Sequence, residues 1–399
     1  MSIRGKAYIA GVYEHPLREI PDRSVAQVHH EVAKGALDDA GLSFDDVDGF
    51  FCAGDSPGFG PLSMAEYFGL TDLSYVDSTE TGGSSYQLHV GHAASAIAAG
   101  KCTVALCTLA GLPRTGGSRQ LGPRGRGGGG RGGGGNMGPE AMFEAPFGPT
   151  ILGMYSMAMR RHSYEFGTTA EQFAAVKVSA SKHAKHNPKA FLPYEVTIED
   201  VLNSPYVAEP LHRLDSCVIT DGGGACIVVS PEVAKAIGKR CVKVLGHGES
   251  PKHTNNGRID LTYTGARWSG PRAFEEAGVT PKDIDYASIY DSFSITVVET
   301  IEDLGFCEKG KGGPFVADGS LVSPDGALPF NTDGGGLCNN HPTNRGGMTK
   351  TIEAVRQLRG EANAPVQVPD CQIALAHGTG GSLGTRMGSG TLILGVTDA

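Results

Sequence analysis

The feature of this sequence that most restricts its fold is an internal repeat. Residues 36–48 read ALDDAGLSFDDVD and residues 273–285 read AFEEAGVTPKDID, so that identical or similar residues recur at a constant offset. Each copy is typical of a helix that ends at a glycine and leads through a short turn into a buried strand. The two strands are expected at Gly49–Ala53 and Tyr286–Tyr290.

A second pair of similar segments follows in the same order. Ala93–Gly100 and Ile352–Gly360 each have the pattern of a helix end, and each leads to a continuously apolar segment, Cys102–Leu106 or Cys371–Leu375. Such a segment is expected for a strand that is buried on both faces. Chance similarity between helix–turn–strand units is the alternative, but two matches in one order favour duplication.

The sequence therefore predicts an α/β protein made of two halves, residues 1–238 and 241–399. The first half is longer because it carries an insertion of helices and loops, residues 110–211. The insertion includes a glycine- and arginine-rich run, residues 116–138, which cannot build a core because glycine has no side chain to bury. We expect this run to be a flexible loop near the active site, with RNA binding as the alternative.

Composition excludes several classes of protein. The formal net charge of −9 disfavours a general nucleic-acid binder, because phosphate contacts need a basic surface. No apolar run approaches the roughly 20 residues that span a bilayer, so no membrane association is expected. The nine cysteines include no CxxC pair, which favours reduced thiols in the cytoplasm.

Four glycine-rich or polar segments lie at the ends of expected strands, where α/β folds place their sites. They are Thr79–Ser85, Tyr290–Phe293, Gly334–Pro342 and Ala376–Gly381. We therefore expect a site in which these segments meet.

The reactive side chains in these segments also have structural interpretations. Ser84 and Ser85 suit helix N-caps as well as nucleophiles. Tyr290 suits a buried aromatic at a strand end, and Asp291 suits a cap or a group that orients a histidine. His341 lies in a loop of glycine and asparagine, which makes it a poor core residue and favours a functional role. The two His-x-x-His pairs lack further ligands nearby, so no metal site is predicted.

The segments GGGLCNNHP and HGTGG, together with the two halves and the insertion, resemble the thiolase superfamily. The sterol-carrier-type thiolases and lipid-transfer-type proteins are the most similar group. The resemblance covers essentially the whole chain. It implies a duplicated thiolase-like fold, with two βαβαβαββ halves layered α/β/α/β/α and a loop domain inserted in the first half.

The resemblance also assigns roles to single residues. His341 matches the histidine that helps form an oxyanion hole and activates the nucleophile in thiolases. Tyr290 and Asp291 occupy the place of an HDCF or NEAF motif, and His377 that of the second cysteine. The resemblance implies that the backbone amides of Gly378–Gly381 form a second oxyanion site, with His377 as a further donor to the thioester oxygen. Gly378, Gly380, Gly381 and Asn340 are expected to contact the acyl-CoA.

The chain departs from thiolases at the nucleophile. Thiolases carry a cysteine at the N-terminus of the helix that ends here near Gly100, where the helix dipole stabilises a thiolate. No cysteine occurs between Cys52 and Cys102, and counting back from Gly100 reaches Gly83, beside two serines. A serine needs a general base in the same step, for which His341 is the candidate.

Three hypotheses follow from these residues. The first is an enzyme that cleaves or forms a C–C bond in an acyl-CoA by retro-aldol or aldol chemistry, with Tyr290 moving a proton, as in the side-chain-cleaving aldolases that this chain resembles. The second is a 3-ketoacyl-CoA thiolase or acetyl-CoA acetyltransferase that uses Ser84 or Ser85. The third is a non-catalytic subunit that binds acyl-CoA or lipid as a scaffold.

The resemblance further implies partners. We expect a homodimer, and a small subunit with a zinc ribbon and an OB fold that binds acyl-CoA, as in members that lack the usual cysteine. Coenzyme A is expected as part of the substrate, with no bound cofactor. These expectations place the protein in lipid metabolism.

Overall fold

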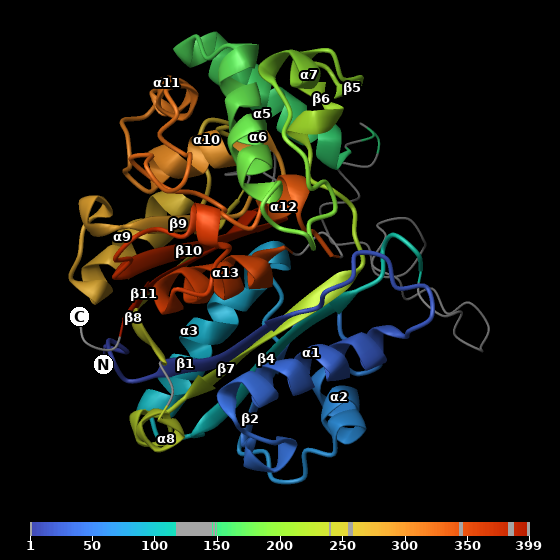
Figure 1. The fold of residues 1–399 in the computed structure, drawn as a ribbon, viewed down its shortest axis with the longest axis vertical. Coiled ribbons are helices and arrows are strands. Elements are labelled where there is room, and N and C mark those ends of the chain that lie inside the picture. Colours follow the sequence, from blue (N-terminus) through green and yellow to red (C-terminus); the bar gives the residue numbers. More distant parts are fainter. Residues whose placement is uncertain are drawn as a thin grey trace.

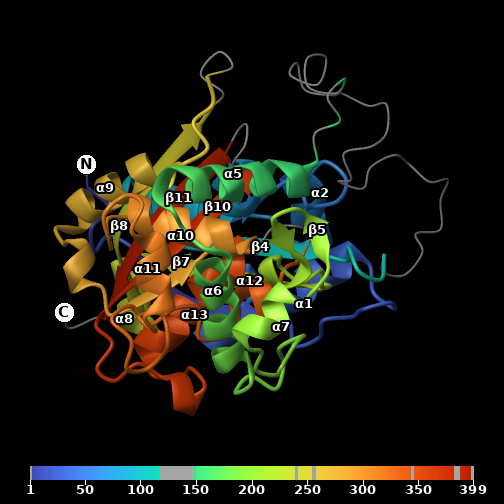
Figure 2. The ribbon, with the colours of Figure 1, turned by 90° about the horizontal axis from the view of Figure 1, so that it is seen from above.

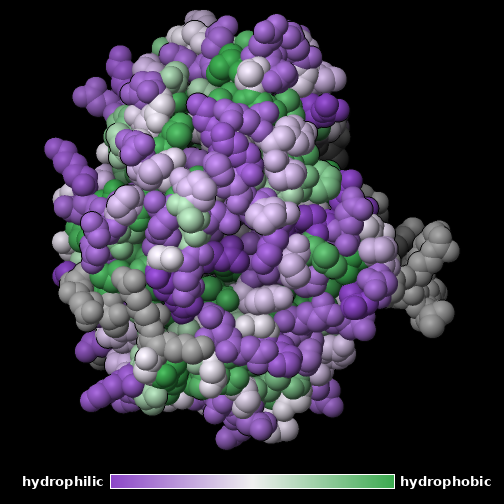
Figure 3. Space-filling view, in the orientation of Figure 1, coloured by the Kyte–Doolittle hydropathy of each residue, from purple (hydrophilic) through white to green (hydrophobic). Residues whose placement is uncertain are grey.

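The computed structural model describes residues 2–116, 146, 148, 150–238, 241–253, 258–342, 346–381 and 387–396. The loop predicted at residues 116–138 therefore lies outside the described residues, apart from Gly116. Within the described residues, none of the helices combines the length and apolar character that crossing a bilayer requires. Figure 3 shows hydrophobic residues scattered among hydrophilic ones over one face of the molecule.

The first half builds a sheet in the order β3-β2-β4-β7-β1 (Figure 1). Strand β2 is parallel to β3 and to β4, whereas β7 is antiparallel to β4 and to β1. The elements of this half are β1 (Tyr8–Glu14), α1 (Val25–Ala40), η1 (Phe44–Asp46), β2 (Gly49–Cys52), α2 (Pro61–Phe68), β3 (Tyr75–Asp77), η2 (Gly82–Ser84), α3 (Ser85–Ala98), β4 (Val104–Gly111), β7 (Gly222–Val229) and α8 (Pro231–Ile237).

The second half builds a sheet in the order β8-β11-β10-β9. Strand β10 is parallel to β9 and antiparallel to β11, which is antiparallel to β8. The elements of this half are β8 (Val242–Lys252), α9 (Ala266–Ala277), η5 (Pro281–Asp283), β9 (Tyr286–Ile289), α10 (Ser294–Asp303), α11 (Gly312–Ala317), α12 (Gly335–Cys338), α13 (Gly347–Arg359), η6 (Ala364–Val366), β10 (Ile373–Gly381) and β11 (Met387–Gly395).

The repeated sequence segments form equivalent elements. The first copy is the end of α1, η1 and β2, and the second copy is the end of α9, η5 and β9. Both helices end at a glycine in the left-handed region, Gly41 at φ 73° and Gly278 at φ 65°. Helices α3 and α13 likewise lead into β4 and β10. The structure thus confirms the predicted duplication and the α/β fold class.

Among the described residues, the sheet of the second half has no strand beside β9 that corresponds to β3 beside β2. Beside β9, in the place that β3 takes beside β2, the described residues form a single bridge between Ala287 and Phe330. Pro329 lies directly before this bridge and has no N–H to extend the ladder.

The two sheets enclose a layer of helices. They are joined at one corner into a continuous nine-stranded ladder, where Tyr8 and Ile9 of β1 pair with Lys243 and Val242 of β8. Helices α3 and α13 lie between the sheets and contact both, while α1 and α2 cover the outer face of the first sheet and α9 and α10 that of the second. Figures 1 and 2 show the resulting order α/β/α/β/α, which the resemblance predicted.

The insertion covers the end of the second half. Between β4 and β7 it forms α5 (Ile151–Phe166), α6 (Ala170–Ala184), α7 (Ile198–Leu202), β5 (Tyr206–Ala208), β6 (Leu211–His212) and η4 (Arg213–Asp215). Helix α6 packs against α10, α11 and α12. The ammonium group of Lys177 on α6 donates to the carbonyl of Leu337 at 2.7 Å. The insertion thereby supports the loop that carries His341.

Candidate active site

A buried tyrosine and a buried histidine meet at the end of the second sheet. Tyr290 follows β9, and His341 lies in the loop after α12. The Tyr290 hydroxyl lies 2.8 Å from His341 Nε2, and the two ring centroids are 5.4 Å apart. The residues are 4% and 3% exposed, respectively. The fold therefore joins two of the predicted site residues into one hydrogen-bonded pair.

Burial decides where the protons of this pair lie. Burial lowers the pKa of His341 to about 4 and raises the pKa of Tyr290 well above its ordinary value. At neutral pH the tyrosine is therefore protonated and the imidazole is neutral, so the phenol donates to Nε2. The neutral ring then carries its hydrogen on Nδ1, which has no hydrogen-bond partner among the described residues.

Asp291 holds the turn that leads to His341. Its two carboxylate oxygens accept from the backbone N–H groups of Gly336, at 2.8 Å, and Leu337, at 3.1 Å. Lys350 of α13 forms an ion pair with it at 2.8 Å, and both side chains are buried. Asp291 thus acts on His341 through the intervening turn, and sequence reasoning did not identify Lys350.

Asn340 uses both ends of its amide inside the protein. Its Oδ1 accepts from the Thr220 hydroxyl at 2.8 Å, and its Nδ2 donates to Glu14 at 2.9 Å. The Thr220 hydroxyl in turn accepts from the backbone N–H of His341 at 2.9 Å. These contacts make Asn340 a support for the loop, while contact with an acyl-CoA stays a prediction. Thr220 was missed because nothing in the local sequence marks it.

The two candidate serines close the turn before α3. The Ser85 hydroxyl accepts from the N–H of Thr81 at 2.8 Å. The Ser84 hydroxyl donates to the Thr81 carbonyl at 3.0 Å and lies 2.9 Å from the Thr81 hydroxyl. Both serines are fully buried. The hydrogen bonds of Ser84 and Ser85 in the described residues thus serve the turn, and none of them involves His341.

Gly83 lies where the resemblance places a cysteine, and Tyr290 occupies the space beside it. A Cβ added to Gly83 would lie 2.4 Å from Cε2 of Tyr290 and 2.4 Å from the carbonyl oxygen of Thr379. Real Cβ atoms essentially never approach this closely. A side chain at position 83 and the Tyr290 ring therefore exclude one another. The sequence located Gly83 but did not indicate that a tyrosine would fill the space.

His377 is hydrogen-bonded on the α9 side of the second sheet. Its Nδ1 lies 2.9 Å from the hydroxyl of Thr391, which lies 2.8 Å from Ser269 on α9. The next residue, Gly378, faces α3, where an added Cβ would come within 2.0 Å of Gln87. Because side chains alternate along a strand, His377 faces the α9 side of the sheet, away from α3. Burial lowers its pKa to about 3, and it does not join the Tyr290–His341 pair.

The predicted amide donors belong to β10. Gly378, Gly380 and Gly381 pair with β11, so the strand continues past the end predicted at Leu375. The pairing of β10 with β9 ends at His377, where the N–H of Tyr290 donates to its carbonyl. A Cβ at Gly380 would lie 1.7 Å from the Thr81 carbonyl, so glycine is needed for close packing against the turn. Donation to a thioester oxygen stays a prediction.

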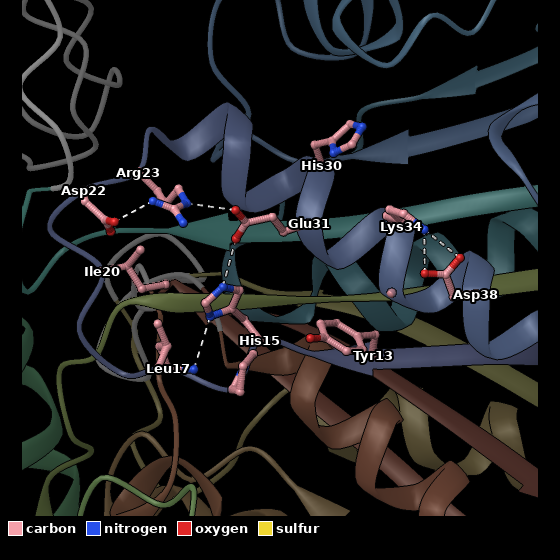
Figure 4. Close-up of a pocket in the computed structure, with 12 residues that line it drawn as sticks. Tyr13, His15, Leu17, Ile20, Asp22, Arg23, His30, Glu31, Lys34 and Asp38 are labelled. Atoms are coloured by element: carbon pink, nitrogen blue, oxygen red, sulfur yellow. Dashed lines mark hydrogen bonds and ion pairs between the residues drawn. The ribbon is translucent and has the colours of Figure 1, made fainter.

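A pocket of about 500 Å³ lies apart from these residues, along α1 (Figure 4). Its charged groups pair with one another: Glu31 with His15 and Arg23, and Lys34 with Asp38. Tyr290 and His341 do not line it. The pocket is lined by Tyr13, His15, Pro16, Leu17, Ile20, Asp22, Arg23, His30, Glu31, Lys34, Gly35 and Asp38.

Among the described residues, no group of three His, Cys, Asp or Glu side chains is arranged to hold a metal ion.

Comparisons with known proteins agree with the fold and the motifs. A thiolase C-terminal domain-like family matches residues 248–396. An acetyl-CoA acetyltransferase of Methanothermobacter thermautotrophicus is 33% identical over 94% of this chain and 97% of that protein. A steroid side-chain-cleaving aldolase of Thermomonospora curvata is 34% identical over 94% of this chain and 96% of that protein. The solved Ltp2-ChsH2(DUF35) aldolase covers both chains completely, with 31% identity and a TM-score of 0.87. The chain therefore belongs to the thiolase superfamily of enzymes.

Proposed function

We propose that this enzyme cleaves, or in reverse forms, the bond between the α and β carbons of a 3-hydroxyacyl-CoA by retro-aldol chemistry. The observation that carries the proposal is the Tyr290–His341 pair, whose tyrosine ring fills the space beside Gly83. A proton relay thus stands where the resemblance places a sulfur nucleophile. The similarity to a steroid side-chain-cleaving aldolase supports the same reaction class.

The hydrogen bond between the two rings supplies the base. Burial opposes both the phenolate and the imidazolium, so neither ring acts alone, and the positive charge on His341 forms only as the negative charge of the enolate develops beside it. In the proposed step the phenol oxygen takes the proton of the β-hydroxyl while the phenol proton passes to His341 Nε2. The β carbon becomes a carbonyl, and the electron pair of the broken C–C bond moves into a thioester enolate.

The enolate oxygen needs hydrogen-bond donors that are already in place. The Nδ1–H of His341, which no described residue accepts, is the first donor that we propose. The second lies among the backbone amides of Gly378–Gly381 that do not point toward β11. Protonation of the enolate at the α carbon then returns the relay to its starting state, and no acyl-enzyme forms.

A second candidate is acetyl transfer, because a relative of similar identity is named an acetyl-CoA acetyltransferase. This function requires an acyl-enzyme at Ser84 or Ser85. The hydroxyls of both serines contact Thr81, and a base in contact with either is absent from the described residues. This arrangement weighs against acetyl transfer.

One experiment separates these functions. The protein is incubated with a 3-hydroxyacyl-CoA and, separately, with a 3-ketoacyl-CoA plus free CoA. The proposal expects a carbonyl compound and a shortened acyl-CoA from the first substrate, with no mass added to the protein. Consumption of free CoA with an acylated serine would establish the transferase instead. If neither reaction occurs even when a candidate small subunit is added, the scaffold hypothesis is favoured.

The proposal extends to partners and location. Coenzyme A enters as part of the substrate, and we propose a homodimer in the cytoplasm that works in lipid metabolism without nucleic acid or membrane. The edge strand β3, with Val76 44% exposed, supports pairing with a second copy. The Ltp2-ChsH2(DUF35) aldolase supports a small second subunit, which we propose is of the zinc-ribbon and OB-fold kind. Light scattering after size-exclusion chromatography tests both assemblies.

A further inference from the structure

A carboxylate from the first half lies beneath the loop that carries His341 in the second half. Glu14 is the last residue of β1 and is 5% exposed. It is 327 positions away in the sequence from His341. The proposed reaction gives it no chemical step, so its burial so close to the site calls for another explanation.

Four hydrogen-bond donors converge on this carboxylate. Its Oε1 accepts from Arg18 at 2.8 Å, from Asn340 at 2.9 Å and from Asn339 at 3.3 Å. Its Oε2 accepts from Arg356 of α13 at 3.1 Å. A carboxylate is an acceptor only, with about four lone-pair sites, so it can accept from all four donors although three of them share Oε1. One side chain thereby ties β1, the loop after it, the His341 loop and α13 together.

The contacts continue to His341. Asn340 accepts from Thr220, whose hydroxyl accepts from the backbone N–H of His341. Asn339 donates from its side chain to Asp333 at 2.9 Å, and its carbonyl accepts from Arg18 at 3.1 Å. Both residues that precede His341 are therefore held through their side chains.

We propose that Glu14 is a positioning residue for His341, acting through Asn339 and Asn340. The kinetic part of this inference rests on the proposed function, whereas the position of the imidazole does not. The competing explanation is that Glu14 serves only as a counter-ion for Arg18 and Arg356 and stabilises the fold.

The charge of Glu14 makes the idea testable by a small change. Burial alone would raise its pKa, but Arg18 and Arg356 lower the pKa to about 2, so the group is ionised at any working pH. In Glu14→Gln an NH₂ group replaces one oxygen where only donors converge. At least one donor then faces another donor, and the loop must move.

Three variants and a control separate positioning from stability. Glu14→Gln breaks the convergence, and Glu14→Asp keeps the charge on a shorter side chain. Asn340→Ala cuts the link to Thr220 while the ion pairs of Glu14 remain, so it also serves if Glu14→Gln fails to fold. The control is Glu302→Gln, which alters another buried carboxylate that is paired with Lys309 and contacted by His162.

Two readouts are compared, each per amount of folded protein. Steady-state kinetics with a 3-hydroxyacyl-CoA give kcat and KM. Long-range ¹H–¹⁵N spectra give the tautomer and titration of His341, whose signals are assigned by their loss in His341→Asn. We expect Glu14→Gln and Asn340→Ala to lower kcat about 10²-fold with KM unchanged, because a displacement of about 1 Å has that effect. Glu14→Asp should retain part of the rate.

The spectra should change in parallel. In Glu14→Gln and Asn340→Ala the neutral Nδ1–H tautomer should no longer dominate, and the pKa of His341 should rise from about 4 toward the ordinary value. Glu302→Gln should lose stability with neither change. If Asn340→Ala and Glu14→Gln keep the wild-type kcat and spectra, Glu14 only stabilises the fold. If the spectra change but even the wild type cleaves nothing, the positioning holds and the proposed reaction is wrong.

Discussion

The variant Gly83→Ala tests most directly whether the Tyr290 ring fills the space beside position 83, where the resemblance places a cysteine. The added Cβ would lie 2.4 Å from Cε2 and 2.7 Å from Cζ of Tyr290, and 2.4 Å from the carbonyl oxygen of Thr379. Ordinary van der Waals contact begins at 3.4 Å. The backbone φ of Gly83 is not in the left-handed region, so any effect of alanine is steric.

The size of the effect follows from these distances. The Tyr290 ring, or the turn that holds Gly83, must move by about 1 Å to relieve the contact. If this movement carries the Tyr290 hydroxyl directly away from His341 Nε2, their 2.8 Å separation becomes too long for a hydrogen bond. We therefore expect kcat for C–C cleavage to fall about 10²-fold. Overpacking should lower the free energy of unfolding by about 1–3 kcal/mol.

The assay compares cleavage of a 3-hydroxyacyl-CoA and thermal unfolding between wild type and variant. The matched control is Gly153→Ala on α5, where the nearest atom to an added Cβ is the Thr150 hydroxyl at 3.1 Å. This variant should keep the wild-type rate. Gly83→Ala with wild-type kcat and stability would refute the steric argument, and with it the conclusion that Tyr290 replaces the thiol.

Three further predictions follow from single side chains. Tyr290→Phe keeps the ring and removes the hydroxyl, so cleavage should slow about 10²–10⁴-fold in a folded protein; a rate near wild type contradicts the relay. Ser84→Ala removes a hydroxyl that bonds Thr81, so cleavage should persist with a loss of about 1 kcal/mol of stability; complete inactivity would favour a serine enzyme. Glu353 has its pKa raised from 4.5 to about 7, first by burial and then by Asp333, so the folded state keeps a proton that the unfolded state releases. The free energy of unfolding should therefore fall by at most about 3 kcal/mol as the pH rises from 4.5 to 7. Melting curves of Glu353→Gln should lack this fall. An equal pH dependence in both proteins would contradict the raised pKa.

The order of the elements could be predicted from the sequence. The repeat at residues 36–48 and 273–285 gave the helix–turn–strand units, because apolar spacing and terminal glycines are properties of a few neighbouring residues. The continuous apolar run at Cys102–Leu106 likewise predicted the buried β4. The segments that meet at the site, such as Tyr290–Phe293 and Gly334–Pro342, were recognised by their glycines and their resemblance to known motifs.

The direction of each side chain could not be predicted in the same way. His377 and Gly378 differ by one position, yet they face opposite sides of the second sheet, because side chains alternate along β10. A motif match that is uncertain by one residue therefore cannot say which of the two faces α3.

The sequence by itself thus determined the duplication, the layered fold and the absence of a cysteine before α3. Only the tertiary structure decided that Tyr290 fills the space beside Gly83, and that Glu14 of the first half holds the loop of His341. The physical reason is the separation along the chain between the groups that interact. Helices, turns and buried strands arise from interactions among near neighbours in the chain, whereas these contacts join groups hundreds of residues apart, which meet only once the two sheets have packed around α3 and α13.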